Sequence, residues 1–316
     1  MRIDQLLVAR GLASTRSQAQ RLIAGGVEWQ QGVANWRRVN KNGDDVPEDA
    51  DLRLLDDSEA RYVSRGGLKL EAALKQVGLS VDGFQCLDVG QSTGGFTDCL
   101  LQQGAKFVVG VDVGSAQLHP KLHADPRVLC VEGVNARALD ASDLIAAYAD
   151  SISASGQFDV DGDGDDDLRD DAGDSADVDA SDASDAVDVD SADAEDAADD
   201  DAEHCDEAPF DDAFVPEFDL IVADLSFISQ TLVLPAVVPL LKAGGTLLTL
   251  VKPQFELQPG QVGKGGIVKD AAMYQIVEQR LRDACAELGL TVTHWFDSAI
   301  TGGDGNREFF ICATKA

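Results

Sequence analysis

The chain has little positive charge and few aromatic residues. Its 316 residues include 25 Lys and Arg against 57 Asp and Glu, a net charge of -32, and only 6% are Phe, Trp or Tyr. Such a balance would normally argue against a nucleic-acid partner. The excess is local, however: residues 150–217 hold 28 acidic residues and one Arg, a net of -27, which leaves -5 for the rest. The total charge therefore describes one segment and excludes no partner for the remainder.

Cysteine pairs and long apolar runs are also missing. The six cysteines stand far apart with no C-x-x-C pair, which favours reduced thiols over a disulfide framework or a zinc site. The opening MRIDQLLVARG is too polar for a secretory signal. The most apolar stretch, from Thr231, meets a lysine after eleven residues and contains two prolines, so it is too short to cross a bilayer. We expect a soluble, cytoplasmic protein without a membrane partner.

Residues 150–217 form an Asp/Ala/Ser tract with almost no large apolar side chains. Charge repulsion and the lack of burial predict a disordered acidic insertion, and a long loop costs little additional closure entropy. Asp159–Gly164 matches the start of a calcium loop, but the twelfth position is Asp170 instead of Glu and no amphipathic helices flank it. Such matches arise by chance in an Asp-rich tract, so we expect no metal.

The sequence on both sides of the tract predicts one interrupted α/β domain, residues 61–316. Helical periodicity, as in Ala271–Leu288, separates several short apolar runs that are bounded by Gly, Asp or Pro. The predicted strands are Cys86–Val89, Phe107–Val113, Arg127–Val131, Phe218–Asp224, Gly245–Val251, Val292–Ala299 and Glu308–Thr314. Seven strands with helical crossovers predict a doubly wound, mostly parallel, Rossmann-like sheet.

Residues 1–60 form a separate small α+β module. Residues 1–41 carry seven Lys and Arg against two acids, a local charge of +5. Leucine spacing predicts two short helices around a turn at Gly11–Thr15, followed by a strand at Val27–Trp29. A basic helix face suits phosphates, although a solvated face on a docking domain would have the same composition.

The order of residues in this module resembles the alpha-L RNA-binding motif. The resemblance rests on Arg2–Leu7, Ser14–Ala19 and Arg21–Val27, and it implies that the two helices contact RNA backbone. The candidate RNA-binding residues here are Arg2, Arg10, Arg16 and Arg21. Glu28–Gly32 departs from the family, which usually has Val-Asn-Gly in this turn.

A glycine-rich turn between a strand and a helix predicts a cofactor site at Leu87–Asp98. Its glycines let the backbone pass close to a ligand, and Asp112, at the end of the next strand, is placed to bind ribose hydroxyls. The pattern G-x-S-T-G-G-F-T-D differs from G-x-G-x-x-G, the pattern of dinucleotide-binding turns. This difference favours S-adenosylmethionine over a dinucleotide as the cofactor. The candidate cofactor-binding residues are Asp88, Gly90, Ser92, Thr93, Gly94, Gly95, Phe96, Asp112 and Asn135. Asp88 is interpreted either as the partner of the methionine amino group or as an anchor behind it.

Two lysines and two acids form a candidate catalytic set: Lys69, Asp224, Lys252 and Glu308. Asp224 and Lys252 end parallel strands, where ligands of such sheets bind. Glu308 begins its strand, so it reaches the same edge only if the last strand runs antiparallel. A ribose hydroxyl must be aligned opposite a sulfonium and lose its proton, which a lysine with a lowered pKa can accept.

These four residues, in this order, resemble the Lys-Asp-Lys-Glu tetrad of FtsJ-type ribose methyltransferases. Outside the tract the chain is similar to the TlyA family of rRNA methyltransferases, which are also called hemolysins. The matching motifs are Tyr62–Leu70, Leu87–Asp98, Ala223–Ser229, Val251–Glu256 and Gly263–Val268. Gln91 and Ala299 depart from the family, which usually has a small residue and Pro there.

The resemblance implies 2'-O-methylation of cytidine in rRNA, with rRNA or ribosomal subunits as partners. Lys252 would be the base and Lys69 its electrostatic partner, Asp224 would hold the donor or Lys252, and Glu308 would position a lysine or the sugar. Lys264 and Lys269 either contact RNA phosphates or lie on a solvated loop. The alternatives are a non-catalytic ribosome assembly factor, a membrane-lytic hemolysin and a small-molecule methyltransferase.

Overall fold

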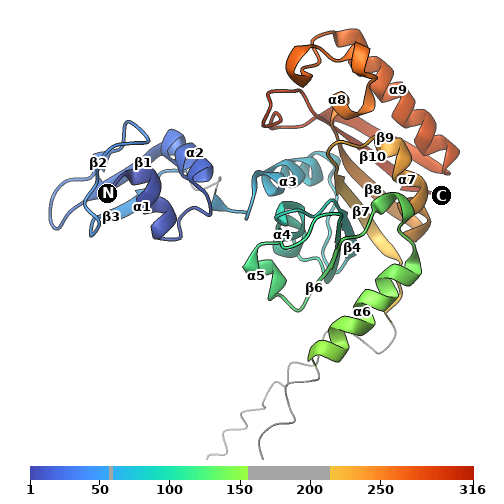
Figure 1. Cartoon of the computed structure of the whole chain (residues 1–316), viewed down its shortest axis with the longest axis horizontal. Helices are drawn as coiled ribbons and strands as arrows, with labels where there is room; N and C mark the ends of the chain where they lie inside the picture. Colours follow the sequence, from blue (N-terminus) through green and yellow to red (C-terminus); the bar gives the residue numbers. More distant parts are fainter. Residues whose placement is uncertain (57–59, 156–213) are drawn as a thin grey trace, which may run out of the picture.

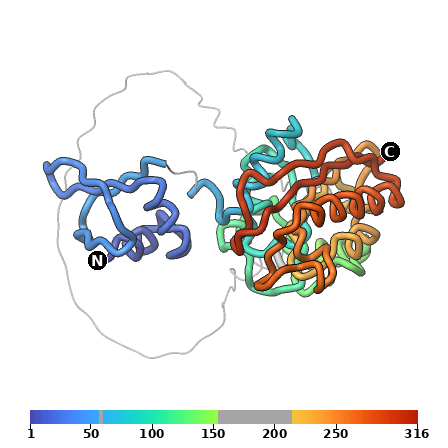
Figure 2. The backbone as a smooth tube through the Cα atoms, turned by 90° about the horizontal axis from the view of Figure 1, so that it is seen from above, coloured from blue at the N-terminus to red at the C-terminus, as the bar shows by residue number. Residues whose placement is uncertain are grey.

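The computed structural model describes residues 1–56, 60–155 and 214–316. The described residues form a small N-terminal unit, residues 1–56, and a larger unit with a central sheet, residues 60–155 and 214–316 (Figures 1 and 2). Asp159–Asp170 and nearly all of the predicted acidic insertion lie outside the described residues.

The N-terminal unit packs two helices against a three-stranded antiparallel sheet. Helix α1 (Ile3–Ala9) and helix α2 (Arg16–Gly26) flank a turn, and the Thr15 hydroxyl caps α2 by accepting the Gln18 N–H at 3.2 Å. The sheet has the order β2-β1-β3 and contains β1 (Val27–Gln30), β2 (Arg37–Arg38) and β3 (Asp51–Leu54). Its core is aliphatic and includes Ile3, Leu7, Leu22 and Val27, all at most 1% exposed.

The larger unit contains a seven-stranded mixed sheet in the order β6-β5-β4-β7-β8-β10-β9. The strands are β4 (Gln85–Val89), β5 (Phe107–Asp112), β6 (Val128–Glu132), β7 (Phe218–Asp224), β8 (Leu241–Val251), β9 (Leu290–Asp297) and β10 (Phe309–Lys315). Neighbours from β6 to β8 are parallel, whereas β10 is antiparallel to both β8 and β9. The predicted α/β fold and its seven strands are confirmed, including the antiparallel direction that Glu308 requires.

Helices cover both faces of the sheet (Figure 1). On one face lie α3 (Arg65–Val77), α4 (Gly95–Gln102) and α5 (Pro120–His123), and on the other lie α6 (Ala141–Ser155), α7 (Leu234–Val237) and α9 (Ala271–Glu287). Alternate residues of each strand enter the two cores: Leu87 and Val89 pack with α6 and α9, whereas Cys86 packs with α3 and α4. Burial on both faces explains why the central strands are continuous apolar runs.

Aromatic packing joins the described residues on either side of positions 156–213. Helix α6 continues to Ser155, and the described chain resumes at Phe214. The Phe214 ring lies 4.8 Å from the Tyr148 ring of α6 and 6.0 Å from the Phe107 ring of β5, measured between centroids. The two described segments therefore pack against each other at one corner of the sheet.

Within the described ranges, no helix combines the length and the apolar character that crossing a membrane requires. The five cysteines in those ranges are all free thiols. Four of them are buried, and burial raises the pKa of each, for example that of Cys285 to about 11. They therefore act as small apolar core residues.

Candidate functional site: a glycine cradle beside two lysine–carboxylate pairs

The site lies where the strand order reverses, between β4 and β7. Gly90 follows β4 and adopts a φ of 85°, and a Cβ atom there would come within 2.9 Å of the Asp224 carbonyl oxygen at the end of β7. The position thus needs glycine both for its left-handed backbone and for this close approach. Ligands of open α/β sheets bind at such a switch point.

Asp88 anchors the glycine turn from behind. Its carboxylate is 1% exposed, and one oxygen accepts the Thr97 N–H at 3.0 Å and the Thr97 hydroxyl at 2.7 Å. Burial raises the pKa of Asp88 to about 7. The side chain is not among the residues that line the neighbouring pockets. One oxygen thus anchors the start of α4, while the other has no hydrogen-bond partner among the described residues, so both of our interpretations stay predictions.

Asp112, at the end of β5, holds the tip of the same turn. Its two carboxylate oxygens accept the N–H groups of Ser92 and Gly114, each at 2.8 Å. Ser92 itself has a φ of 47°, which is uncommon for a residue with a side chain. Asn135 lies on the same pocket and accepts the Arg137 N–H at 3.1 Å. The turn, Asp112 and Asn135 therefore border one cavity.

Two adjoining cavities extend along this sheet edge and share Gly90, Ser92, Asp224 and Ser226. Most of the predicted cofactor residues line them: Gly90, Ser92, Thr93, Gly95, Phe96, Asp112 and Asn135. Gly94, like Asp88, is not on the lining, and its φ of 89° instead starts α4 where a Cβ would strike Leu122. Sequence reasoning missed Ser64, Val113, Gln117, Ser226 and Phe227, which also line the cavities.

The lining fits a nucleoside-bearing cofactor. The glycine turn offers close backbone approach, and Asp112 places a carboxylate where ribose hydroxyls bind in such folds. Apolar side chains beside it, including Val113, Ile228 and Leu232, provide flat surface for a base. The narrower cavity between the turn and Lys252 is mainly polar, as the methionine end of S-adenosylmethionine would require.

Lys252 directly follows β8 and points to the end of β7. Its ammonium lies 2.5 Å from an Asp224 carboxylate oxygen and donates to the Ser226 hydroxyl at 3.0 Å. The Lys252 side chain is 13% exposed, so it is mostly shielded from water but still reaches the cavity surface.

Lys69 and Glu308 form a second, more deeply buried pair. The Lys69 ammonium lies 2.5 Å from a Glu308 oxygen, and the two side chains are 10% and 3% exposed. Burial raises the pKa of Glu308, while the charge of Lys69 opposes that increase. Lys69 is held there by α3, whose Gly67 packs under the Tyr62 ring with no room for a Cβ atom.

The structure thus brings together the four residues of the candidate catalytic set. Phe309 pairs with Val251 in the β10–β8 ladder, which brings Glu308 beside Lys252. The charges of Lys252 and Asp224 both act on the Glu308 carboxyl, in opposite directions. Two lysine–carboxylate pairs, from residues up to 239 positions apart, therefore meet next to the glycine turn.

An exposed aromatic side chain stands at the mouth of the site. Phe227 is 91% exposed and has a φ of 64°, and its ring lies 5.0 Å from that of Phe255 between centroids. Both rings line the wider cavity. Exposure of a large apolar ring together with an unfavourable backbone conformation is a typical sign of a binding role. Phe227 follows Asp224 by three residues, yet nothing in its local sequence distinguishes it from a core Phe.

The predicted RNA-binding arginines differ in their partners and in their exposure. Arg2 and Arg16 each bind the buried carboxylate of Asp4 at 3.0 Å and remain about half exposed. Arg10 donates to the Glu48 carbonyl and Arg21 is partly buried on α2. The pairing with Asp4 fixes two guanidinium groups in place and cancels part of their charge. Lys264 lies on a Gly-rich segment (Gly263–Gly266) that Asn306 holds by donating to the Gly266 carbonyl at 2.9 Å.

Gln91, which departs from the family pattern, fits because β5 has a glycine beside it. A Cβ atom on Gly110 would lie 1.9 Å from the Gln91 amide. The Gln91 side chain is 4% exposed and donates to the Thr97 hydroxyl at 2.9 Å. The larger residue therefore reinforces the Asp88–Thr97 contact without blocking the turn.

Comparisons with known proteins agree with this architecture. Residues 62–315 match the family model of FtsJ-like methyltransferases, and residues 1–26 match that of the S4 domain. The candidate rRNA methyltransferase YqxC of Bacillus subtilis (strain 168) is 36% identical over 98% of this chain and 84% of its own length. The 16S/23S rRNA (cytidine-2'-O)-methyltransferase TlyA of Mycobacterium tuberculosis (strain CDC 1551 / Oshkosh) is 33% identical over 98% of this chain and 88% of its own.

A solved structure is similar over the whole chain. The candidate hemolysin from Streptococcus thermophilus has a TM-score of 0.60 at 32% identity, covering 100% of this chain and 88% of that protein. The family match spans most of the chain and includes the glycine turn and both ion pairs. The chain is therefore an S-adenosylmethionine-dependent methyltransferase of the TlyA family, with an S4 domain in front of an FtsJ-like catalytic domain.

Proposed function

We propose that this enzyme transfers a methyl group from S-adenosylmethionine to a ribose 2'-hydroxyl of rRNA, with cytidine as the target nucleoside. One observation carries the proposal: the Lys69–Glu308 and Lys252–Asp224 pairs lie together beside the cofactor cavity. The similarity to the Mycobacterium tuberculosis relative, a 16S/23S rRNA (cytidine-2'-O)-methyltransferase, supports rRNA and cytidine as the substrate, and the S4 domain supports RNA binding.

S-adenosylmethionine supplies an electrophilic methyl group on a positively charged sulfur. The chain must then align the 2'-oxygen with that methyl group, which by itself contributes much of the rate. Lys252 is the residue best placed to take the hydroxyl proton, because its ammonium position borders the cavity next to Asp224 and Ser226. Asp224 orients Lys252 through their 2.5 Å contact.

Lys69 and Glu308 support the site from outside the lining of the cavity. Neither side chain lines the cavity, so the pair acts by fixing geometry and charge next to Lys252. Phe227 and Phe255 provide an aromatic surface on which an unstacked base can lie while its ribose reaches the donor. Arg2, Arg10, Arg16, Arg21 and Lys264 supply contacts to RNA phosphates.

The test is transfer of tritiated methyl groups to purified ribosomal subunits, followed by mapping of ribose methylation. Lys252→Ala should lower the rate by at least about 100-fold, the lower end of what a general base contributes. Full-speed transfer by Lys252→Ala, or a methyl group found on a base instead of a ribose, would refute the proposal.

A further inference from the structure

Glu256 is a buried carboxylate to which the catalytic set gives no role. It ends the short helix α8 (Pro253–Glu256), four residues after Lys252, and it is 3% exposed. One carboxylate oxygen accepts the Ser229 hydroxyl at 2.5 Å, and the other accepts the Gln230 N–H at 2.8 Å. Both donors belong to the segment that leaves β7, so Glu256 connects two loops at the same edge of the sheet.

The segment that Glu256 holds carries the functional groups of the site mouth. It begins at Asp224 and includes Ser226, which accepts from Lys252, and Phe227, with its left-handed backbone. A backbone in this conformation persists only when its surroundings hold it. Lys252 holds the segment at its start, through Ser226, and Glu256 holds it at its end, through Ser229 and Gln230.

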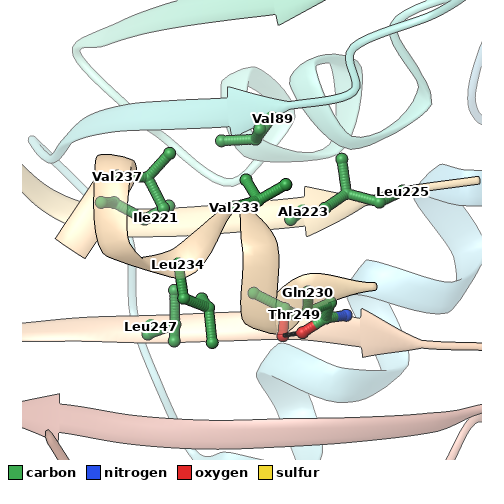
Figure 3. Close-up of a pocket in the computed structure, with 10 residues that line it drawn as sticks. All are labelled: Val89, Ile221, Ala223, Leu225, Gln230, Val233, Leu234, Val237, Leu247 and Thr249. Carbon is green, nitrogen blue, oxygen red and sulfur yellow. Dashed lines mark hydrogen bonds between the residues drawn. The ribbon is translucent and has the colours of Figure 1, made fainter. Parts of the chain in front are cut away.

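Gln230 extends the connection into the sheet. Its amide donates to the Leu250 carbonyl at 2.7 Å and accepts the Thr249 hydroxyl at 2.7 Å, at the edge of an otherwise apolar pocket (Figure 3). Arg280 of α9 donates to the Glu256 carbonyl and so holds α8 from the other side. The β7 loop, β8 and α8 are therefore tied into one unit just behind Lys252.

We propose that Glu256 is a positioning residue that acts through Ser229 and Gln230 to fix Phe227 and Ser226 relative to Lys252. It touches neither substrate nor cofactor, since the residues lining the two cofactor cavities do not include it. The kinetic part of this inference rests on the proposed methyl transfer. The structural part, the immobilisation of residues 225–232, does not.

Three variants of the full-length protein separate this role from simple stability. Glu256→Ala leaves the buried Gln230 N–H without an acceptor, whereas Glu256→Gln can still accept it and can donate to the Ser229 hydroxyl, which then donates to Thr231. Ser229→Ala removes the bond to Glu256 together with the contacts of the hydroxyl to the Thr231 N–H and hydroxyl, but it leaves the Gln230 N–H its acceptor. Glu287→Ala, on the exposed end of α9, is the matched control.

We expect Glu256→Ala to lower kcat on ribosomal subunits about tenfold or more and to speed amide exchange in residues 225–232 about tenfold, as loss of a partner for a buried donor predicts. The Kd for S-adenosylmethionine should rise as well, because Ile228 and Leu232 of the loosened segment line the wider cofactor cavity. Glu256→Gln should recover most of the kcat, and Ser229→Ala should fall between the two. Glu287→Ala should match the wild type.

Unchanged exchange in residues 225–232 of Glu256→Ala would overturn the inference, as would a Glu256→Gln variant as slow as Glu256→Ala. If Glu256→Ala does not fold, Ser229→Ala decides: unchanged exchange and kcat there also overturn it. A wild-type protein that transfers no methyl group would refute the proposed function instead, and the exchange comparison would still test the role of Glu256.

Discussion

Removing one partner of the Lys69–Glu308 pair is expected to destabilise the fold more than removing both. The two side chains are 10% and 3% exposed and meet at 2.5 Å, so Lys69→Met would leave the Glu308 carboxylate buried with its nearest counter-charge lost. Breaking a buried ion pair in this way costs about 3–5 kcal/mol, whereas replacing both ions by neutral side chains is often neutral or stabilising. The free energy of unfolding of the double variant Lys69→Met/Glu308→Gln should therefore be higher than that of Lys69→Met by about 2 kcal/mol or more at pH 8.

The loss of stability that Lys69→Met causes should also depend on pH. Burial raises the pKa of Glu308, and the lysine that opposes this increase is gone in the variant. Between the ordinary carboxyl pKa of about 4.3 and this higher value, the folded variant binds a proton that the unfolded chain releases. Stability therefore falls as pH rises through that window. The difference in free energy of unfolding between the variant and the wild type should be small near pH 4 and should reach its maximum above the raised pKa of Glu308.

Urea unfolding at several pH values measures these free energies. Trp295 reports on the relevant region, because its ring stacks on Phe309 at 5.3 Å, next to Glu308. Replacing Trp29 and Trp36, the other two tryptophans, by Phe in every variant would isolate this signal. Equal stability of Lys69→Met and wild type at pH 8 would show that the pair is not buried as described. A double variant that is less stable than both single variants, Lys69→Met and Glu308→Gln, would show the same.

Two further outcomes test other parts of the site. Phe227→Ala should lower kcat/KM on ribosomal subunits by about 5- to 150-fold, the equivalent of the 1–3 kcal/mol that a base–aromatic stack contributes; an unaffected kcat/KM would exclude base stacking. Asp88 has a pKa raised to about 7 by burial, so the ligand-free protein should lose stability as pH rises from about 4 to about 7, and Asp88→Asn should remove that part of the slope in the same urea measurements.

The sheet could be predicted from the sequence because each of its strands is a short apolar run with a clear boundary. Phe218–Asp224 is reproduced residue for residue, and no boundary of the other strands shifts by more than four residues. The antiparallel direction of the last strand followed from placing Glu308, at the start of that strand, at the same sheet edge as Asp224 and Lys252. Both inferences depend on local pattern and on the geometry of sheets, which a single sequence records.

The parts that could not be predicted depend on contacts between distant residues. Glu256 meets Ser229 across 27 positions, and nothing local to either residue indicates a bond. The predicted RNA-binding face likewise omitted Asp4, whose buried carboxylate holds Arg2 and Arg16. Spacing along a helix indicated which side chains share a face but not which of their charges are already paired.

The register of three neighbouring strands explains why the catalytic set converges. Asp224 pairs with Leu250 in the parallel β7–β8 ladder, and Phe309 pairs with Val251 in the antiparallel β8–β10 ladder. Continuing each ladder past the last strand residue brings Lys252 level with Ser226 on one side and with Glu308 on the other. A slip of one residue in either ladder would turn these side chains to opposite faces of the sheet. The buried apolar residues that fix the register of β8, from Leu247 to Val251, therefore also fix the chemistry of the site at its end.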